Sequence, residues 1–148
     1  MRIKNTSRYP DERVREILAF AARGIRDSGV EVHVKNSSYI YAGTFYQSAA
    51  DLRDVSSSIC NAAECLIVVR IGAPDNFPIR ATYPGLKTAP EMEYRSWEEA
   101  LVGVAAHEFC HLKQYRRGKR YSDVAAERWA KKCLEEFRAA GRRGGLRG

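Results

Sequence analysis

The sequence predicts an α+β domain in which a small, mainly antiparallel sheet packs against helices. Three observations carry this prediction. Short alternating or β-branched runs occur in the first half of the chain, two segments of the last third have the period of helices, and no β-α-β alternation appears. The length of 148 residues suits one domain. We therefore assign residues 1–138 to a single domain and residues 139–148, which are rich in glycine and arginine, to a basic flexible tail.

The first predicted element is a helix over residues 10–26. Pro10 and Asp11 suit its first turn, and apolar side chains recur on one face of the segment that follows. Gly29 then provides a stop signal.

Three strands are predicted next. Residues 30–34 alternate between valine and polar side chains, which is the pattern of a half-buried strand, and we expect His33 to face solvent. A polar turn then returns the chain as the second strand of a hairpin over residues 39–46. No period is clear over residues 47–64. The short β-branched run 65–71 predicts a buried strand.

Residues 72–94 form a long segment without a periodic pattern, and four prolines interrupt it. A loop of this length inside a compact domain is unusual, and such loops are often functional.

Two helices complete the predicted domain. Ser96 and Glu99 form a capping box for a helix that runs to about Tyr115. Ser122 can cap a last helix that runs through about Phe137.

The first of these two helices carries the motif His107-Glu108-Phe109-Cys110-His111. Helical residues four positions apart lie on one face, with β-carbons about 5–6 Å apart. Both imidazoles can therefore reach one zinc ion at a Zn–N distance of about 2.0–2.1 Å. Glu108 lies beside them, where it can accept a proton from zinc-bound water. The motif predicts a Zn²⁺ site with His107 and His111 as ligands and Glu108 as the catalytic base.

The residues around the motif are apolar on every side, which is typical of a buried helix. An unpaired buried carboxylate would cost several kcal/mol, so Glu108 needs a partner in this dry setting. A divalent cation with bound water satisfies the glutamate and both histidines together. The alternative is that the two histidines are hydrogen-bonded core residues.

A catalytic zinc ion needs a third protein ligand and leaves the fourth position to water. The last helix offers two acids, Asp123 and Glu127, on one stripe of apolar residues that should pack against the metal-binding helix. Acids are unusual on such a face unless a positive charge lies opposite them.

Together, the motif and the downstream helix resemble the HExxH zinc metallopeptidases, or zincins, most closely the minimal, single-domain SprT-like and related intracellular ones. The specific resemblance covers residues 107–130, and upstream it extends only to the order of the elements. Several such families carry a downstream E-x-x-A-[D/E/N] helix whose first acid is the third ligand. The matching stretch here, 123–127, begins with an aspartate in place of the usual glutamate. The resemblance implies Asp123 as the ligand and Glu127 as an acid that orients a histidine, with Glu127 as the alternative ligand.

The resemblance also implies a zincin-like fold and a peptidase that cleaves a peptide or protein substrate. Glu108 would assist the attack of zinc-bound water on the carbonyl and pass the proton to the leaving amine. The strand over 65–71 would be the edge strand along which zincins bind an extended peptide. Four tyrosines are near enough in sequence to stabilise the oxyanion: Tyr83, Tyr94, Tyr115 and Tyr121. The zinc ribbon that some SprT-like proteins carry has no counterpart in this sequence.

The formal charge of +7 is concentrated in two places. One is the basic cluster Lys113–Arg120, with five cations and no acid, and the other is the arginines of the C-terminus. Such a balance permits contact with nucleic acid, although a solvated basic face has the same composition. Two alternatives to a peptidase follow: a proteolytically inactive zinc-binding domain, and a basic nucleic-acid-binding domain in which the metal is incidental.

Composition also bears on the compartment. Four cysteines without a C-x-x-C pair are too few for a disulfide scaffold, so we expect reduced thiols. No apolar run reaches the length of a membrane span, and polar residues stand where a signal peptide would be apolar. We therefore expect a cytoplasmic protein that does not bind membranes.

Overall fold

The computed structural model describes residues 1–48 and 63–143, and it is α+β as predicted. Its elements in chain order are β1 (Arg2–Asn5), α1 (Asp11–Ala21), β2 (Val30–Asn36), β3 (Tyr41–Tyr46), β4 (Cys65–Ile71), the 3₁₀ turn η1 (Pro74–Asn76), β5 (Ile79–Ala81), β6 (Met92–Tyr94), α3 (Trp97–Arg116) and α4 (Asp123–Arg142). Residues 49–62, where the sequence shows no clear period, and residues 144–148 of the predicted tail lie outside the described residues.

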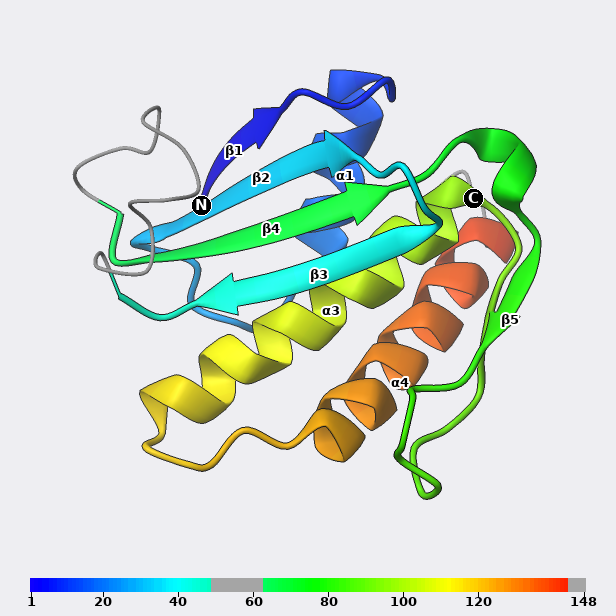
Figure 1. The fold of residues 1–148 in the computed structure, drawn as a ribbon. Coiled ribbons are helices and arrows are strands. Elements are labelled where there is room, and N and C mark those ends of the chain that lie inside the picture. The colour runs from blue at the N-terminus through cyan, green and yellow to red at the C-terminus, as the bar shows by residue number, and fades with distance from the viewer. Residues whose placement is uncertain (49–62, 144–148) are drawn as a thin grey trace.

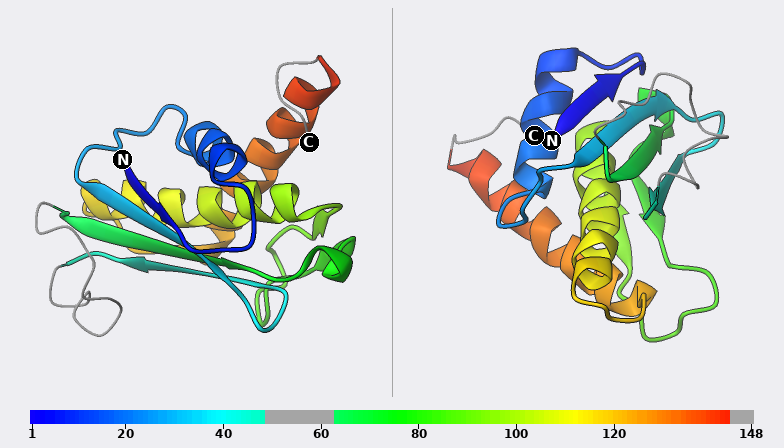
Figure 2. Two further views of the ribbon diagram at one scale, coloured as in Figure 1. Left: turned by 90° about the horizontal axis from the view of Figure 1, so that it is seen from above. Right: turned by 90° about the vertical axis from the view of Figure 1, so that its left-hand side faces the viewer.

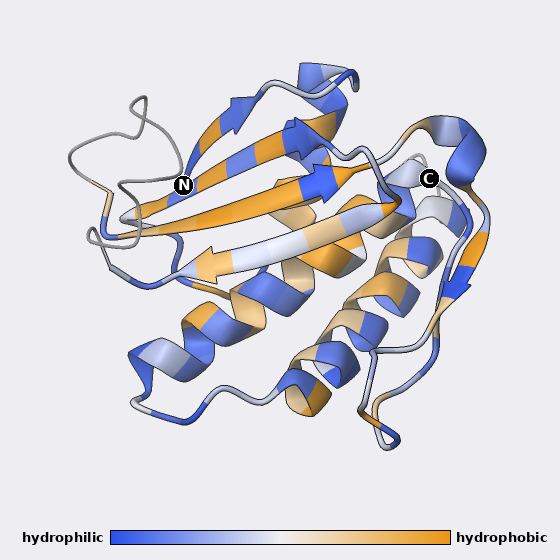
Figure 3. Cartoon of the chain, in the orientation of Figure 1, coloured by the Kyte–Doolittle hydropathy of each residue, from blue (hydrophilic) through white to orange (hydrophobic). Residues whose placement is uncertain are grey.

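The four-stranded sheet is mixed, with the order β1-β2-β4-β3 (Figure 1). β2 pairs in parallel with β1 and β4, and only β3 runs antiparallel to its neighbour β4. The expectation of a mainly antiparallel sheet was therefore wrong. The absence of a β-α-β unit was also wrongly predicted, because β1 and β2 are parallel neighbours with α1 between them in the chain. The predicted hairpin of β2 with β3 was wrong as well, because β4 lies between them. The physical reason is visible in Figure 3, where β4 is hydrophobic over most of its length. A strand that is apolar on both faces is most stable in the interior of a sheet.

The helices lie on one face of the sheet (Figure 2). α3 is the central helix, and it packs against β3 and β4 of the sheet and against the helices α1 and α4. Fifteen of its twenty residues are buried, as the apolar residues around the motif predict. Within the described residues, no helix is both long and apolar enough to cross a membrane.

Several boundaries differ from the prediction. α1 ends at Ala21, well before residue 26. α4 continues to Arg142, so residues 139–142, which we assigned to the flexible tail, are helical. An ion pair stabilises this extension, because Arg138 donates to the buried carboxylate of Glu99 on α3 at 2.7 and 3.0 Å. The long segment after β4 also contains structure, namely η1 and the two-stranded sheet of β5 and β6.

His33 is buried and does not face solvent as predicted. Its side chain is 1% exposed, and its Nε2 lies 2.8 Å from a carboxylate oxygen of Glu31, which is equally buried. Alternation along β2 indicated one solvated face, but both faces of this interior strand are buried.

Candidate metal centre

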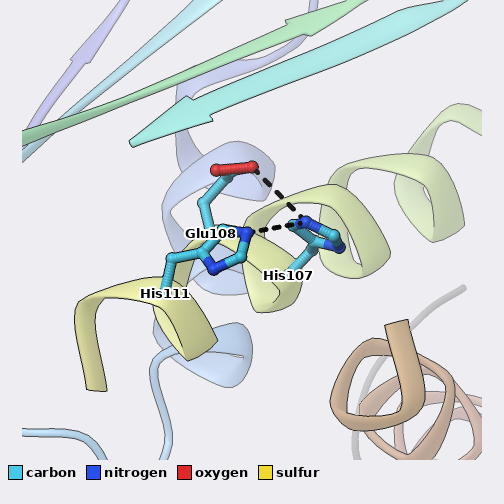
Figure 4. A group of neighbouring side chains, drawn as sticks. All are labelled: His107, Glu108 and His111. Atoms are coloured by element: carbon cyan, nitrogen blue, oxygen red, sulfur yellow. Dashed lines mark hydrogen bonds and ion pairs between the residues drawn. The ribbon is translucent and has the colours of Figure 1, made fainter. Parts of the chain in front are cut away.

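The helix α3 places its three motif residues in a buried position beside the sheet. Ser96 begins the helix and its hydroxyl accepts a hydrogen bond from the backbone N–H of Glu99 at 3.3 Å, as the capping box predicts. His107, Glu108 and His111 are between 5% and 9% exposed. Their ligand atoms lie within 4.8 Å of one another, so this group could hold a metal ion (Figure 4).

The two histidine rings converge. His107 Nε2 and His111 Nε2 are 3.1 Å apart, and the ring planes are nearly perpendicular at 81°. Asp123 Oδ1, from the first turn of α4, lies 3.2 Å from His107 Nε2 and 3.0 Å from His111 Nε2. Three donor atoms from two helices therefore form a nearly equilateral triangle.

This triangle has the dimensions of a zinc site. Zinc ligands at about 2.0–2.1 Å in a tetrahedron are about 3.3–3.4 Å from one another. The three observed separations of 3.0–3.2 Å are slightly shorter, so an ion would fit with small outward movements of the side chains. Two imidazole nitrogens and one carboxylate oxygen are also a donor set that zinc accepts.

Glu108 stands apart from the triangle. Its Oε1 is 3.9 Å from His107 Nε2, farther than either contact of Asp123, and the side chain extends from α3 toward β3 (Figure 4). β3 approaches closely at Gly43, where an added Cβ would lie 3.1 Å from Glu108 Cγ and 2.7 Å from Val104 Cγ1. The absence of a side chain at Gly43 is what permits the strand to pass beside the glutamate.

Two further side chains contact the Nδ1 atoms of the histidine rings, on the side away from the triangle. Glu127 Oε1 lies 2.9 Å from His107 Nδ1, although off the ideal direction for a hydrogen bond. Gln114 Oε1 lies 2.8 Å from His111 Nδ1. Gln114 also accepts a hydrogen bond from the backbone N–H of Ser122 and donates one to its carbonyl oxygen, at 3.2 and 3.3 Å. Because Ser122 is the N-cap of α4, this one buried amide connects His111 to the start of the helix that carries Asp123.

The electrostatics of the centre favour a positive charge. Burial acts to lower the pKa of His107, but Glu127, Glu108 and Asp123 outweigh it and the pKa is raised. Burial also raises the pKa of Glu108, against the opposing effect of the two histidines. Acidic groups thus gather around the imidazoles, and Glu108 is inclined to carry a proton at higher pH than an exposed glutamate.

The four candidate tyrosines differ in their relation to the centre. Tyr83 stacks on His107, with ring centroids 5.6 Å apart and planes 4° from parallel. Tyr121 packs against His111 at 5.4 Å. Tyr94 is buried against α3 at Gly103, and Tyr115 is 44% exposed beside Phe45. Tyr83 and Tyr121 thus contact the histidine rings, whereas Tyr94 and Tyr115 do not pack against them.

A cavity of about 290 Å³ adjoins the motif residues. It lies between α3, the first half of β3 and the segment that contains β5 and β6. Its lining residues are Tyr41, Ala42, Gly43, Ala81, Thr82, Tyr83, Pro84, Met92, Tyr94, Val104, His107, Glu108 and Glu127.

The structure thus brings together the five residues that the sequence singled out: His107, Glu108, His111, Asp123 and Glu127. It does not bring β4 to the site as an edge strand, because β4 is interior and the strand beside Glu108 is β3. Sequence reasoning missed Gln114 and Gly43. Gln114 could have been found as a polar residue one helical turn after His111 and on the same side of the helix, whereas nothing in the sequence marked Gly43.

The basic cluster Lys113–Arg120 continues from the same helix. Lys113 Nζ lies 4.4 Å above the ring of Trp129, and Arg116 donates to the backbone carbonyls of Arg26 and Ser28. Within residues 1–48 and 63–143, none of the five cations lies within 4 Å of a carboxylate. Lys113, Arg116 and Arg117 border a surface hollow with Arg26.

Comparisons of the chain with protein-family models, with curated proteins and with solved structures gave no match.

Proposed function

We propose that this protein is a zinc-dependent metallopeptidase in which His107, His111 and Asp123 hold the ion. The observation that carries the proposal is the triangle of donor atoms, with sides of 3.0–3.2 Å, beside a buried glutamate that stands outside it. A purely structural zinc site needs four protein ligands, whereas a catalytic one uses three. The bound ion would supply two things, a lowered pKa for a water molecule and polarisation of the substrate carbonyl.

Glu108 is the proposed catalytic base. Its carboxylate is buried beside the triangle of donor atoms but outside it, where it can accept a proton from the attacking water and then release it. As the water oxygen bonds to the carbonyl carbon, its proton passes to Glu108. Glu108 then delivers the proton to the amide nitrogen as the C–N bond breaks, and an amine and a carboxylic acid leave.

The substrate is proposed to bind along β3. One edge of β3 pairs with β4, and within the described residues no strand pairs with the other. Ala42, Gly43 and Thr44 are exposed, so their backbone groups are accessible to an extended peptide. Because Gly43 lies beside Glu108, a peptide paired with β3 would pass directly over the reacting groups.

The test combines metal analysis with hydrolysis of a protein substrate. We expect the wild-type chain to bind one zinc ion and to cleave the substrate, and Glu108→Gln to keep the zinc and lose about 10²–10⁴-fold in kcat/KM. Glu91→Gln, a change of the same kind at a 54%-exposed position, is the control and should have wild-type activity. Zinc binding without hydrolysis by the wild type would instead favour the inactive zinc-binding domain. An active Glu108→Gln would overturn the role of the glutamate.

A second proposed function, which is compatible with the first, is binding of nucleic acid through the basic cluster Lys113–Arg120. It is favoured by five cations without a carboxylate partner among the described residues, and by an isoelectric point of about 9.4. The double variant Arg117→Glu/Lys119→Glu should weaken binding of a labelled oligonucleotide and reduce its salt dependence. Charge reversal at Arg80, a 74%-exposed arginine on β5, should have little effect. If the double variant and the Arg80 variant lost equal affinity for the oligonucleotide, the cause would be net charge in general, which would argue against a binding surface at the basic cluster.

A further inference from the structure

Part of the lining of the cavity beside the metal centre belongs to none of the proposed catalytic groups. Three residues of this part are buried and largely apolar: Met92, Tyr94 and Val104, which are 3%, 2% and 6% exposed. The ring of Tyr41 meets that of Tyr94 at 90°, with centroids 5.3 Å apart. This part of the cavity is therefore walled by two aromatic rings, a thioether and an aliphatic side chain.

The charges of the cavity are confined to the end at the metal centre. The two carboxylates of the lining belong to Glu108 and Glu127, and Glu127 is already engaged by His107 at 2.9 Å. Among the described residues that line the cavity, none is lysine or arginine. An acidic side chain would find no lysine or arginine among these lining residues and would be repelled by both glutamates. A cationic one would lose its hydration against Met92 and Val104, and the two carboxylates of the lining lie at the metal centre, where His107 and the proposed ion offset their charge.

The size of the cavity sets a second limit. Its volume of about 290 Å³ is just below the range of about 300–1,000 Å³ that is usual for pockets that hold a whole small molecule. It suits one large side chain. The T-shaped pair of Tyr41 and Tyr94 leaves ring edges and faces with which a further aromatic ring can form favourable contacts.

The position of the cavity relates it to the scissile bond. Tyr41, Ala42 and Gly43 of β3 line it, and Gly43 is also the residue that passes beside Glu108. A peptide extended along β3 would therefore reach the reacting groups and the cavity within about one residue, since successive residues of a strand are about 3.3 Å apart.

We propose that this cavity is the specificity pocket of the peptidase, and that it selects a large apolar or aromatic side chain on a substrate residue next to the cleaved bond. The inference rests on the proposed peptidase function. Its test must therefore report on the cavity itself as well as on cleavage.

The methyl group of Met92 can serve as an NMR probe of the cavity, because the chain has only two methionines and their signals are easily told apart. Met1 precedes β1, at the edge of the sheet opposite to β3, and serves as the internal reference. Zinc-loaded Glu108→Gln protein with ¹³C-labelled methionine methyl groups would be titrated with end-blocked peptides that differ at one residue. We expect peptides with phenylalanine or leucine to shift the Met92 resonance with at least about 10-fold higher affinity than those with alanine, lysine or glutamate. A Met92 resonance that stays fixed, or that responds equally to phenylalanine and lysine, would overturn the proposal.

Two phenylalanine variants of β5 provide a matched comparison, one that fills the cavity and one that does not. Ala81 of β5 lies directly opposite Met92 of β6, so their side chains share one face of the small sheet, whereas Arg80 points to the other face. Ala81→Phe should weaken the response of Met92 to the phenylalanine peptide by at least about 10-fold, and Arg80→Phe should leave it unchanged. Undiminished binding by Ala81→Phe would show that the substrate side chain lies elsewhere.

Cleavage of the same peptides by the wild-type protein, which retains Glu108, separates the proposed peptidase function from the proposed specificity pocket. If Met92 responds as expected but no peptide is hydrolysed, the peptidase function fails and the binding pocket stands. If all peptides are hydrolysed at similar rates while Met92 does not respond, the peptidase stands and the pocket fails. With both proposals correct, kcat/KM should follow the same order of side chains as the Met92 affinities.

Discussion

At the scale of single residues, the choice of the third ligand can be decided by experiment. Asp123 Oδ1 faces both Nε2 atoms, whereas Glu127 faces Nδ1 on the far side of the His107 ring. A group on Nδ1 orients the ring and raises its basicity but does not touch an ion held at Nε2. The geometry therefore favours the assignment that the sequence resemblance implies.

We accordingly predict that Asp123→Ala lowers zinc affinity more than Glu127→Ala does. Loss of an orienting group typically reduces metal affinity by about 10–100-fold, and loss of a direct ligand should exceed this. Competition with a chromophoric chelator measures both values. Ser122→Ala, which changes the neighbouring cap without removing an acid, controls for damage to the start of α4. The reverse order of affinities would transfer the ligand role to Glu127.

At the scale of elements, the candidate metal centre depends on how α3 and α4 are joined. The turn between them uses Gly118 at φ +64°, and Gln114 bridges the turn by contacting His111 at one side and Ser122 at the other. Without this amide, the ring of His111 and the first turn of α4 would each lose a buried hydrogen-bonding partner.

Gln114→Ala should therefore lower zinc affinity by about 10–100-fold and destabilise the protein by about 1–3 kcal/mol. Gln114→Glu keeps the oxygen that faces His111 Nδ1 and the N–H of Ser122, and loses the N–H donor to the Ser122 carbonyl and to Cys110 Sγ. It should restore most of the zinc affinity. Chelator competition and urea unfolding, measured on both variants, test this bridge. If the two variants bound zinc equally weakly, the acceptor oxygen would not be what matters.

At the scale of the whole molecule, periodic patterns predicted which segments form helices and strands but not how the strands pair. The capping serines and the apolar faces of α3 and α4 are local signals, and both helices begin where these signals place them. Strand order is a non-local choice. Residues 30–36 and 41–46 are adjacent in sequence, yet burial of the apolar β4 between them gives the more stable sheet. For the same reason His33, on an interior strand, is buried.

The candidate centre was more predictable than the sheet because its core lies within one helix. His107, Glu108 and His111 need only the period of the helix to meet, and Asp123 and Glu127 follow on the inward stripe of the next helix. Gly43 and Tyr41 could not be predicted in this way. They reach the site through β3, whose position depends on the pairing that the sequence did not reveal.

The ion should also stabilise the domain as a whole, because its proposed ligands come from two helices that contact each other. Without it, the carboxylates of Glu108, Asp123 and Glu127 lie around the two histidines of the centre and repel one another. Zinc at about 100 times its Kd would add about 2.7 kcal/mol to the free energy of unfolding. For a domain of this size, that corresponds to a rise in Tm of about 5–11 °C.

Scanning calorimetry of the metal-free protein with and without zinc measures this rise in Tm. Magnesium, which prefers six oxygen ligands, should not reproduce it. The double variant His107→Ala/His111→Ala should unfold at the same temperature with or without zinc, and a zinc-dependent rise in that variant would place the stabilising ion outside the α3–α4 centre.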